Sequence, residues 1–423
     1  MSKPSIIIIG AGATGLIAAK ELSAKFNVTM LEAQAFIGGR VQSEKDKDDI
    51  IETGAEFIHG NLPLTLGLLK DAGIPYEQTA GRMYRKRNGR FLEVEEMTEG
   101  WDDLLQKMKE VEEDTTMQEL LDKHYAAPRY ELLRRHAKSY VEGFDLADLT
   151  RVSVKALHRE WEWDSEDEEI YRIPTGYTAL IKYLEQQVKA NGCVLYLQTV
   201  VQEVQWKKGT VSVHASNGEK YTADKLLVTV PVGVLQQPGA TPYIHFKPPL
   251  PFDENITRQI GYGAVIKVVL KFTKTFWQND AGFILSDEFF PTWWTQLPNE
   301  TSILTGWLGG PRAAAISNES DDRILVKAIS SLAAIYDKPI EQLRNEIQWS
   351  KVFNWQANEF AMGAYSYPTP QTESAQRLIS EPIAGTVFFA GEALYTGPHP
   401  GTVEAAFESG IRVAGIISTV LNV

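Results

Sequence analysis

Lys267 is the side chain in this sequence best placed to do chemistry, because it lies inside an apolar segment with the pattern of a strand, residues 261–272. Side chains alternate between the faces of a strand, so Val265, Lys267 and Val269 share one face. An ammonium among β-branched residues is expensive to bury unless it has a partner. Two interpretations follow: an edge strand whose lysine reaches solvent, or a buried strand whose lysine has a functional role.

Three ring-bearing side chains could shape a pocket for an organic substrate. Trp355 and Tyr365 belong to an aromatic-rich stretch, residues 349–367, and such rings either pack a core or form the wall of a binding site. His59 precedes Gly60. An imidazole has an ordinary pKa that lets it change charge near neutrality, although a structural role suits a lone histidine equally.

A glycine-rich turn near the N-terminus has the pattern of a dinucleotide site. Residues 5–9 suit a buried strand, residues 10–15 read Gly-Ala-Gly-Ala-Thr-Gly, and residues 28–31 suit a second strand that ends on an acid. The glycines permit the tight turn, the approach of a pyrophosphate and close helix packing, while the acid can bind a ribose. The candidate cofactor residues here are Gly10, Gly12, Ala13, Gly15 and Glu32.

Motifs beyond this turn argue for FAD rather than NAD. Gly-Gly-Arg-Val spans residues 38–41, and Thr-Gly-Ala-Glu-Phe spans residues 53–57. Near the other end, a strand-like run at 387–390 is followed by Gly-Glu, and residues 401–406 open a helix whose free N–H groups could face a flavin. These segments add the candidates Gly39, Arg40, Gly54, Ala55, Glu56, Gly391, Glu392, Thr402 and Val403.

These motifs, in this order, resemble the flavin-containing amine oxidase family over nearly the full chain. That family includes monoamine oxidases, polyamine and spermine oxidases, L-amino-acid oxidases and the oxidase domain of lysine-specific histone demethylases. The resemblance implies that Lys267 holds a water against flavin N5 and that the backbone of Val201 holds the adenine. It also implies that the Val403 N–H points at the flavin pyrimidine and that Arg40 offsets pyrophosphate charge. Tyr365 then matches one wall of an aromatic cage for the amine.

Two residues depart from the pattern of the monoamine oxidases. Ala364 stands where they have the cysteine that bonds to the flavin, so we expect FAD to be held non-covalently. Thr402 stands where they have the second cage tyrosine, which leaves the substrate open. The loop around His59 resembles the family loop beside the flavin, where spermine oxidases also have a histidine. We therefore expect a substrate pocket lined by His59, Trp355, Tyr365 and Thr402.

The bulk composition fits a globular enzyme and argues against several other classes. With 423 residues the chain can form two domains with sizeable cores, and a net charge of −13 without a basic stripe argues against nucleic-acid binding. Cys193 is the only cysteine, which suits a reducing compartment and a cytoplasmic location. The 7 histidines lack metal-ligand spacing, and no segment has the pattern of a membrane span. We expect no metal site and no membrane partner.

The order of the motifs predicts two interleaved domains. We expect an α/β FAD-binding domain of the Rossmann-like, glutathione-reductase type, made discontinuous by insertions, and an α+β substrate domain of the amine oxidase type. The FAD-binding domain is assigned residues 1–76, 168–247 and 378–423. The substrate domain is assigned residues 77–167, which are rich in helical spacing, and residues 248–377.

The function that these features predict is FAD-dependent oxidation of a primary or secondary amine, either a mono- or a polyamine. The product would be an imine that water hydrolyses to the aldehyde, with O2 reduced to hydrogen peroxide. An L-amino-acid oxidase of the same family is the alternative, and it needs a pocket arginine such as Arg82, Arg172 or Arg312. From another class, the chain could be a flavin-bearing scaffold subunit with little activity. The sequence leaves the amine and the oligomeric state open.

Overall fold

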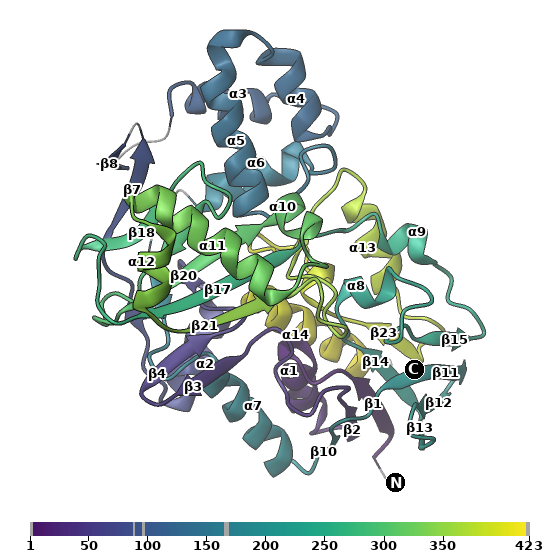
Figure 1. The fold of residues 1–423 in the computed structure, drawn as a ribbon. Helices are drawn as coiled ribbons and strands as arrows, with labels where there is room; N and C mark the ends of the chain where they lie inside the picture. The colour runs from purple at the N-terminus through teal and green to yellow at the C-terminus, as the bar shows by residue number, and fades with distance from the viewer. Residues whose placement is uncertain (1–2, 88, 95–97, 165–168, 420–423) are drawn as a thin grey trace.

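The computed structural model describes residues 3–87, 89–94, 98–164 and 169–419. Figure 1 shows a parallel sheet near the two termini, a larger sheet beside it, and a cluster of helices at the end of the molecule opposite the termini. Within these described residues, no helix is both long and apolar enough to cross a membrane.

Five strands from distant parts of the sequence form the parallel sheet, in the order β10-β2-β1-β14-β23. The run of isoleucines in β1 is typical of a parallel strand that is covered on both faces. Ile6 and Ile8 point into one hydrophobic core, and Ile7 and Ile9 point into another. The predicted discontinuous α/β domain is therefore confirmed. The strands are β1 (Ser5–Ile9), β2 (Asn27–Leu31), β10 (Val194–Tyr196), β14 (Lys225–Val228) and β23 (Val387–Phe389).

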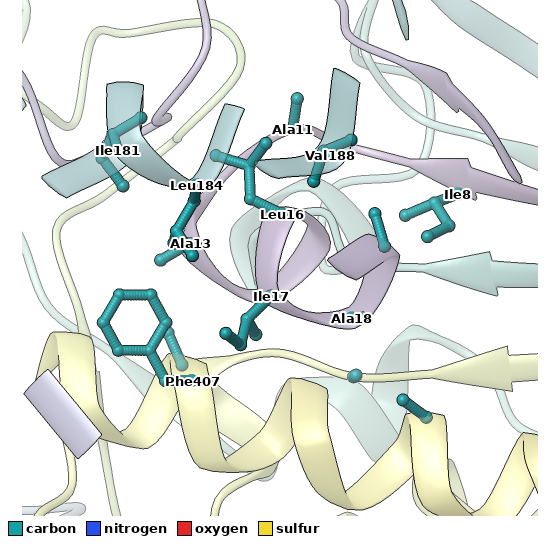
Figure 2. Close-up of a cluster of buried hydrophobic side chains, with 14 of the residues drawn as sticks. Ile8, Ala11, Ala13, Leu16, Ile17, Ala18, Ile181, Leu184, Val188 and Phe407 are labelled. Carbon is teal, nitrogen blue, oxygen red and sulfur yellow. The ribbon is translucent and has the colours of Figure 1, made fainter. Parts of the chain in front are cut away.

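Three long helices cover the Ile6 face of this sheet. Figure 2 shows Leu16 and Ile17 of the first helix between Leu184 and Phe407 of the other two. The first and last helices approach closely at Gly410, because a Cβ at that position would lie 2.5 Å from Ile17 Cγ2. This packing fixes the glycine turn that begins the first helix. The helices are α1 (Ala13–Leu22), α7 (Thr178–Ala190) and α14 (Val403–Thr419).

A four-stranded sheet and three shorter helices cover the other face. Val204 and Val213 of that sheet share a core with Ile7 of the parallel sheet. Ala375 and Ile379 of helix α13 join the same core, although most of α13 falls in the segment assigned to the substrate domain. The domain boundaries themselves remain a prediction. The elements are β11 (Val201–Lys207), β12 (Thr210–Ala215), β13 (Lys220–Ala223), β15 (His245–Lys247), α8 (Val232–Leu235), α9 (Glu254–Thr257) and α13 (Thr372–Ser380).

The larger sheet has seven strands in the order β21-β17-β20-β19-β18-β7-β8. Strand β17, which carries Lys267, is paired on both sides, with β20 and β21. The edge-strand interpretation is therefore wrong. The predicted alternation is confirmed, because Ile266 and Val268 face the core under helix α11 while Lys267 faces away from it. The elements are β7 (Arg82–Arg87), β8 (Arg90–Glu93), β17 (Val265–Phe272), β18 (Ala281–Leu285), β19 (Thr292–Trp294), β20 (Ile303–Gly309), β21 (Ile347–Asn354) and α11 (Asp321–Tyr336).

The sequence predicts helices in residues 77–167, but the segment begins with strands. Strands β7 and β8 form a hairpin at the edge of the larger sheet. Six of the ten strand residues of this hairpin are charged, so no apolar alternation indicates a strand there. The helical pattern is confirmed beyond it, where four helices pack around Leu104, Leu120 and Leu157. These helices are α3 (Trp101–Lys109), α4 (Met117–His124), α5 (Glu131–Gly143) and α6 (Val154–Asp164).

Short helices and strands lie between the two sheets, and one of them is fixed by a buried acid. Glu404 in α14 is fully buried, and its carboxylate accepts hydrogen bonds from the N–H groups of Leu64 and Thr65 at 2.8 and 2.7 Å. It therefore ties the start of α2 to the last helix of the chain. The short elements are β3 (Ser43–Asp46), β4 (Asp49–Glu52), β5 (Ile58–His59), α2 (Pro63–Ala72), β6 (Glu77–Gln78), β9 (Ile170–Arg172), β16 (Gly261–Tyr262), α10 (Gly310–Ala315), α12 (Ile340–Glu346) and β22 (Ser366–Tyr367).

Candidate active site

A cavity of about 1500 Å³ extends from the glycine turn of the parallel sheet to the face of the larger sheet that carries Lys267. It continues as far as helix α5 of the helical cluster. The structure brings together all the predicted site residues except Gly15 along its wall. They are Gly10, Gly12, Ala13, Glu32, Gly39, Arg40, Gly54, Ala55, Glu56, His59, Val201, Lys267, Trp355, Tyr365, Gly391, Glu392, Thr402 and Val403.

The glycine turn leaves open space beside the first turn of α1. A Cβ on Gly12 or Gly39 would have its nearest neighbour at 4.0 or 3.7 Å, and one on Gly391 would have none within 4 Å. Gly15 has a different part: a Cβ there would lie 2.1 Å from the carbonyl oxygen of Gly10, so α1 can pack on the turn only with glycine. The first N–H groups of a helix have no partner within it. Open backbone next to such groups fits a phosphate.

Glu32 ends β2 beside this turn and is buried. Its Oε2 accepts a hydrogen bond from the Ala11 N–H at 2.7 Å, and its Oε1 accepts one from the Gln34 N–H at 2.9 Å. Burial raises the pKa of Glu32 in spite of these donors. The N–H of Thr199 donates to the Glu32 carbonyl at 2.8 Å, which brings the segment of Val201 next to the acid. An ionised carboxylate has about four acceptor positions, which is more than these N–H groups use, so Glu32 can also bind a ribose hydroxyl.

Arg40 and Glu392 form an ion pair at the centre of the cofactor motifs. The Arg40 guanidinium donates to Glu392 Oε2 at 2.9 Å and to the Ala364 carbonyl at 2.6 Å. The other oxygen of Glu392 accepts hydrogen bonds from the backbone N–H and the hydroxyl of Ser366. The pair therefore joins a loop of the FAD-binding motifs to the aromatic segment that follows Ala364.

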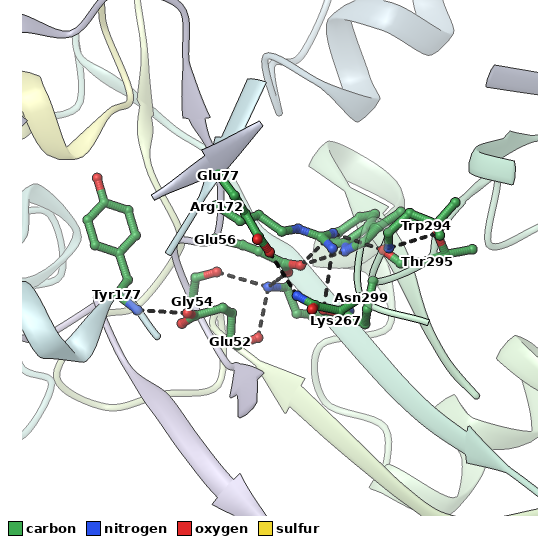
Figure 3. A network of polar contacts seen from close by, with 12 residues as sticks. Glu52, Gly54, Glu56, Glu77, Arg172, Tyr177, Lys267, Trp294, Thr295 and Asn299 are labelled. Carbon is green, nitrogen blue, oxygen red and sulfur yellow. Dashed lines mark hydrogen bonds and ion pairs between the residues drawn. The ribbon is translucent and has the colours of Figure 1, made fainter. Parts of the chain in front are cut away.

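Lys267 is 1% exposed, and its ammonium is held by the chain around residues 52–56. Nζ donates to the carbonyls of Glu52 and Gly54 and to Oε2 of Glu56, each at 2.9 Å (Figure 3). An ammonium has three N–H donors, so each one has a protein acceptor in this arrangement. These contacts offset the cost of burying the charge. A water on Nζ, as the family resemblance implies, would have to replace one of them.

Glu56 is the centre of the buried polar network in Figure 3. Besides Lys267, its carboxylate contacts the guanidinium of Arg172 at 3.0 Å and accepts a hydrogen bond from Trp294 Nε1 at 2.9 Å. Burial opposes ionisation, but Lys267 and then Arg172 outweigh it and hold the pKa of Glu56 below its ordinary value. Arg172 also donates to the Thr295 carbonyl at 2.9 Å. The sequence offers no obvious basic partner for Glu56, and the fold supplies two.

Aromatic rings border the cavity near Lys267. Trp355 Nε1 donates to the Thr53 carbonyl at 2.8 Å, which fixes the indole against the loop that holds the lysine. The Tyr365 hydroxyl donates to the Phe144 carbonyl. The Tyr365 ring lies against Gly401, where a Cβ would be 3.0 Å from the ring. Both predicted aromatic residues therefore line a shared wall and are fixed by hydrogen bonds to the backbone.

His59 lies on the same wall between two phenylalanines. Its ring centroid is 5.9 Å from that of Phe57 and 5.7 Å from that of Phe144. Burial in these apolar surroundings lowers the pKa of His59 to about 4. The imidazole is therefore neutral at pH 7, and the expectation that it changes charge near neutrality is wrong.

Thr402 lies on the cavity wall and also has a structural role. Its hydroxyl accepts a hydrogen bond from the Ala405 N–H at 3.1 Å and donates to the His399 carbonyl at 2.8 Å. It is therefore the N-cap of α14, which begins at Val403. From the sequence, Thr402 is a candidate residue for the flavin and for the substrate, but this cap is missed.

Several cavity residues are missing from the sequence-based expectation. Trp294, Trp307 and Phe283 project into the cavity from three neighbouring strands of the larger sheet. Trp293 points the other way and is fully buried in the core, so the alternation of a strand separates the adjacent tryptophans. Thr229 follows β14 and donates its hydroxyl to the Ile9 carbonyl at 2.8 Å. Thr229 could have been predicted as a cavity residue from its position directly after a parallel strand, where such sheets bind ligands.

The three arginines considered for a substrate carboxylate lie in different surroundings. Arg82 is 57% exposed and pairs with Glu93 at 2.7 Å. Arg172 is buried against Glu56. Arg312 lines the cavity from α10 and acts on the pKa of Glu142 through its charge.

The fold and the site together define a two-domain protein with a parallel sheet of the dinucleotide-binding type. Residues 13–418 match the family model described as flavin containing amine oxidoreductase. The chain therefore belongs to the flavin-containing amine oxidoreductase family, and membership implies a flavin cofactor.

Proteins similar in sequence include histone demethylases and polyamine oxidases. The human lysine-specific histone demethylase 2 is 29% identical over 456 residues, which cover 98% of this chain and 53% of that protein. Polyamine oxidase 3 of Oryza sativa is 25% identical, over 97% of this chain and 88% of that protein. The chain thus spans about half the length of the human and mouse demethylases that it matches.

Solved structures of amine oxidases share the fold. Cyclohexylamine oxidase from Brevibacterium oxydans superposes with a TM-score of 0.83 over 100% of both chains, at 18% identity. Wild-type putrescine oxidase bound to putrescine superposes with a TM-score of 0.81 over 99% of both chains, also at 18% identity. The two-domain fold expected from the sequence is therefore confirmed.

Proposed function

We propose that this protein holds FAD non-covalently in the cavity and oxidises a primary or secondary amine. The observation that carries the proposal is the position of Lys267. Its buried ammonium contacts the loop of residues 52–56, which is one of the predicted flavin motifs, and faces the cavity beside Trp355 and Trp294. Membership of the amine oxidoreductase family and the fold shared with amine oxidases support the same reaction.

When bound, FAD supplies the acceptor for a hydride equivalent from the carbon that bears the amine, and O2 returns it to the oxidised state with release of hydrogen peroxide. The residues of the chain hold and orient the cofactor and the amine substrate. The ring of Tyr365 offers an apolar face for the alkyl part of the amine, and the surrounding aromatic residues exclude water. Glu56 is already paired with two cations, so it is not free to hold the substrate as an ammonium. An amine near Lys267 is therefore favoured in its neutral, reactive form.

Non-covalent attachment is proposed because Ala364 lies where a linking cysteine would be. Its N–H donates to the Gly263 carbonyl at 2.8 Å and its carbonyl accepts from Arg40, so the backbone is fixed while the side chain is only a methyl group. A methyl group cannot form a bond to the flavin. Contacts in the cofactor region of the cavity would then hold FAD without a covalent link.

The substrate end of the proposed site is formed by His59, Trp355, Tyr365 and Thr402. A neutral His59 can accept a hydrogen bond from an incoming ammonium. An L-amino-acid oxidase needs a free guanidinium near the flavin for the carboxylate. Arg172 is already bound to Glu56 and Thr295, and Arg312 lies close enough to Glu142 to lower the pKa of that acid. We therefore favour an amine without an α-carboxylate. A cytoplasmic location is part of the proposal and is supported by the single cysteine.

The proposal is tested with the purified protein in two steps. Denaturation should release free FAD into the supernatant, whereas flavin that stays with the precipitate would contradict non-covalent binding. The native protein should then produce hydrogen peroxide with at least one member of a panel of mono-, di- and polyamines and L-amino acids. A protein that contains FAD but forms no peroxide with any of them would support the scaffold alternative instead.

A further inference from the structure

A row of paired residues crosses the larger sheet from Lys267 to its far edge. Lys267 pairs with Trp307, Trp307 with Thr292, Thr292 with Leu285, and Leu285 with Arg85. Residues directly opposite each other on neighbouring strands share a face, and all five line the cavity. Four strand spacings of roughly 4.8 Å place the Cα atoms of Lys267 and Arg85 about 19 Å apart along this row. The sheet thus forms one continuous floor from the proposed reaction centre to the hairpin of β7 and β8.

The far end of this floor is basic. Arg85 and Arg87 project from β7 into the cavity, and Arg135 and His136 face them from helix α5. The stripe of α5 that carries Arg135 is separate from its buried stripe, which packs into the helical cluster through Ala137 and its neighbours. Both elements therefore present their charges to the same part of the cavity. We call Arg85, Arg87 and Arg135 the arginine group.

The arginine group forms no ion pair with the part of the chain that the structure describes. Among the described residues, no carboxylate oxygen comes within 4.0 Å of a nitrogen of these three side chains. Burial lowers the pKa of Arg85, and the repulsion of Arg135 and Arg87 lowers it further, while only Asp287 acts in the opposite direction. The pKa of His136 is also lowered, by burial and then by Arg85 and Arg135. Like charges gathered on a cavity wall are stabilised when an anion binds between them.

Asp287 also lines this part of the cavity and acts on the pKa of Arg85 and of His136, whereas three other acidic residues of the wall lie nearer to other groups. Glu93 pairs with Arg82 at 2.7 Å, and Glu142 pairs with Lys138 at 3.7 Å. Glu160 acts on Tyr365, near the reaction centre. The cavity therefore has an aromatic end close to Lys267 and a separate cationic end at the sheet edge.

We propose that the arginine group binds an anionic group at the far end of a long amine substrate, so that the amine lies near Lys267 and a carboxylate lies between Arg85 and Arg135. This inference rests on the proposed amine oxidation and adds the class of substrate, an amine that carries a distal carboxylate. The apolar and aromatic floor between the two ends fits an extended hydrocarbon chain. The distance separates this subsite from the α-carboxylate site of an amino-acid oxidase, which would have to lie beside the reacting carbon.

The test compares straight-chain primary amines with ω-amino carboxylates of the same chain length, from short to long, by the rate of peroxide formation. We expect kcat/KM to favour the ω-amino carboxylate once the chain is long enough to reach the arginine group. The double variant Arg85→Gln/Arg135→Gln should reduce this preference about ten- to a hundredfold, since charge-assisted hydrogen bonds are lost. Oxidation of short amines by the variant should be unchanged.

Lys86→Gln is the matched control, because it removes one positive charge from the same strand on the opposite face. Lys86 pairs with Asp337 at 2.6 Å, away from the cavity. This variant should keep the full preference. Equal kcat/KM for the amines and their ω-carboxylates at every length would overturn the proposal, and so would a preference that survives in the double variant. Turnover of short amines would still support the oxidase in either case.

A binding measurement keeps the proposal testable even if no amine is oxidised. Long-chain carboxylates without an amine are titrated while the fluorescence of the cavity tryptophans, Trp294 and Trp307, is followed. We expect saturable binding that weakens with salt and is about tenfold weaker in the double variant but not in Lys86→Gln. Equal binding by the parent and the double variant would contradict the subsite.

Discussion

Nζ of Lys267 lies 2.9 Å from Oε2 of Glu56, and neither side chain is more than a few per cent exposed. The same carboxylate contacts the guanidinium of Arg172 at 3.0 Å. One buried carboxylate therefore compensates two buried cations, and the backbone carbonyls of Glu52 and Gly54 complete the shell of the lysine. This arrangement makes Glu56 the residue that fixes where the proposed catalytic lysine lies.

Glu56→Gln is expected to destabilise the protein strongly. The substitution keeps the size of the side chain but leaves two buried cations without their carboxylate, which costs about 3–5 kcal/mol for a broken buried pair. Chemical denaturation should show this loss in the free energy of unfolding. Lys351→Gln is the control, because it breaks the pair of Lys351 with Glu44, both partly exposed, and should cost no more than about 1 kcal/mol. Similar losses in the two variants would contradict the structural part assigned to Glu56.

Lys267→Met is expected to retain FAD but to slow reduction of the flavin by an amine, its reoxidation by O2, or both. A positioned ammonium that stabilises developing charge is typically worth about 2–4 kcal/mol, so a rate loss of roughly 30- to 1000-fold is expected. Stopped-flow spectroscopy separates the two half-reactions. Lys271→Met tests the same change four residues along the strand, where the lysine pairs with Asp49 and does not line the cavity, and should leave both rates nearly unchanged.

The contribution of Glu52 to the stability of the protein should fall as the pH rises towards neutrality. Burial raises the pKa of Glu52 from 4.5 to about 7 in the folded state. The folded state thus holds this proton more tightly than the unfolded state, so the contribution is complete below pH 4.5 and is lost as the pH passes about 7. In Glu52→Gln the free energy of unfolding should decline less over this interval. An identical pH profile of the free energy of unfolding in the parent and the variant would show that Glu52 does not contribute to the pH dependence.

Tyr365→Ala is expected to lower kcat/KM for the best amine, because the ring positions the substrate as well as contacting it. Tyr365→Phe keeps the ring and removes only the hydrogen bond to the Phe144 carbonyl, so it should retain most of the activity. Unchanged kinetics in Tyr365→Ala would contradict its assignment to the substrate pocket.

Thr402→Tyr should narrow the range of substrates towards small arylalkylamines. Because Thr402 also caps α14, Thr402→Ala is needed to measure the loss of the cap alone, about 1 kcal/mol.

The cofactor region could be predicted from the sequence because its chemistry lies in contiguous motifs. Gly10, Gly12 and Gly15 have the spacing that a turn before a helix requires, and Glu32 follows the next strand. The alternation in β17 likewise predicts the face on which Lys267 lies. These are local consequences of backbone geometry, and they do not depend on what packs against them.

The remaining features depend on contacts between distant parts of the chain. Glu56 and Lys267 are 211 residues apart in the sequence, so no local pattern shows that they form a pair. The central position of β17 depends on β20 and β21, which follow later in the chain. The charged residues of β7, the strand of Arg85, hide its strand pattern, because both faces of a strand near the edge of a sheet can carry polar side chains when one face lines a cavity.

Anaerobic spectroscopy of the flavin tests the central claim most directly. The purified protein is mixed without oxygen with each member of the amine panel, and the absorbance of the oxidised flavin is recorded before and after air is admitted. At least one amine should bleach the flavin, and air should restore the absorbance with one hydrogen peroxide formed per flavin. A flavin that stays oxidised with every amine, although FAD is bound at full occupancy, would contradict amine oxidation as the function of this site.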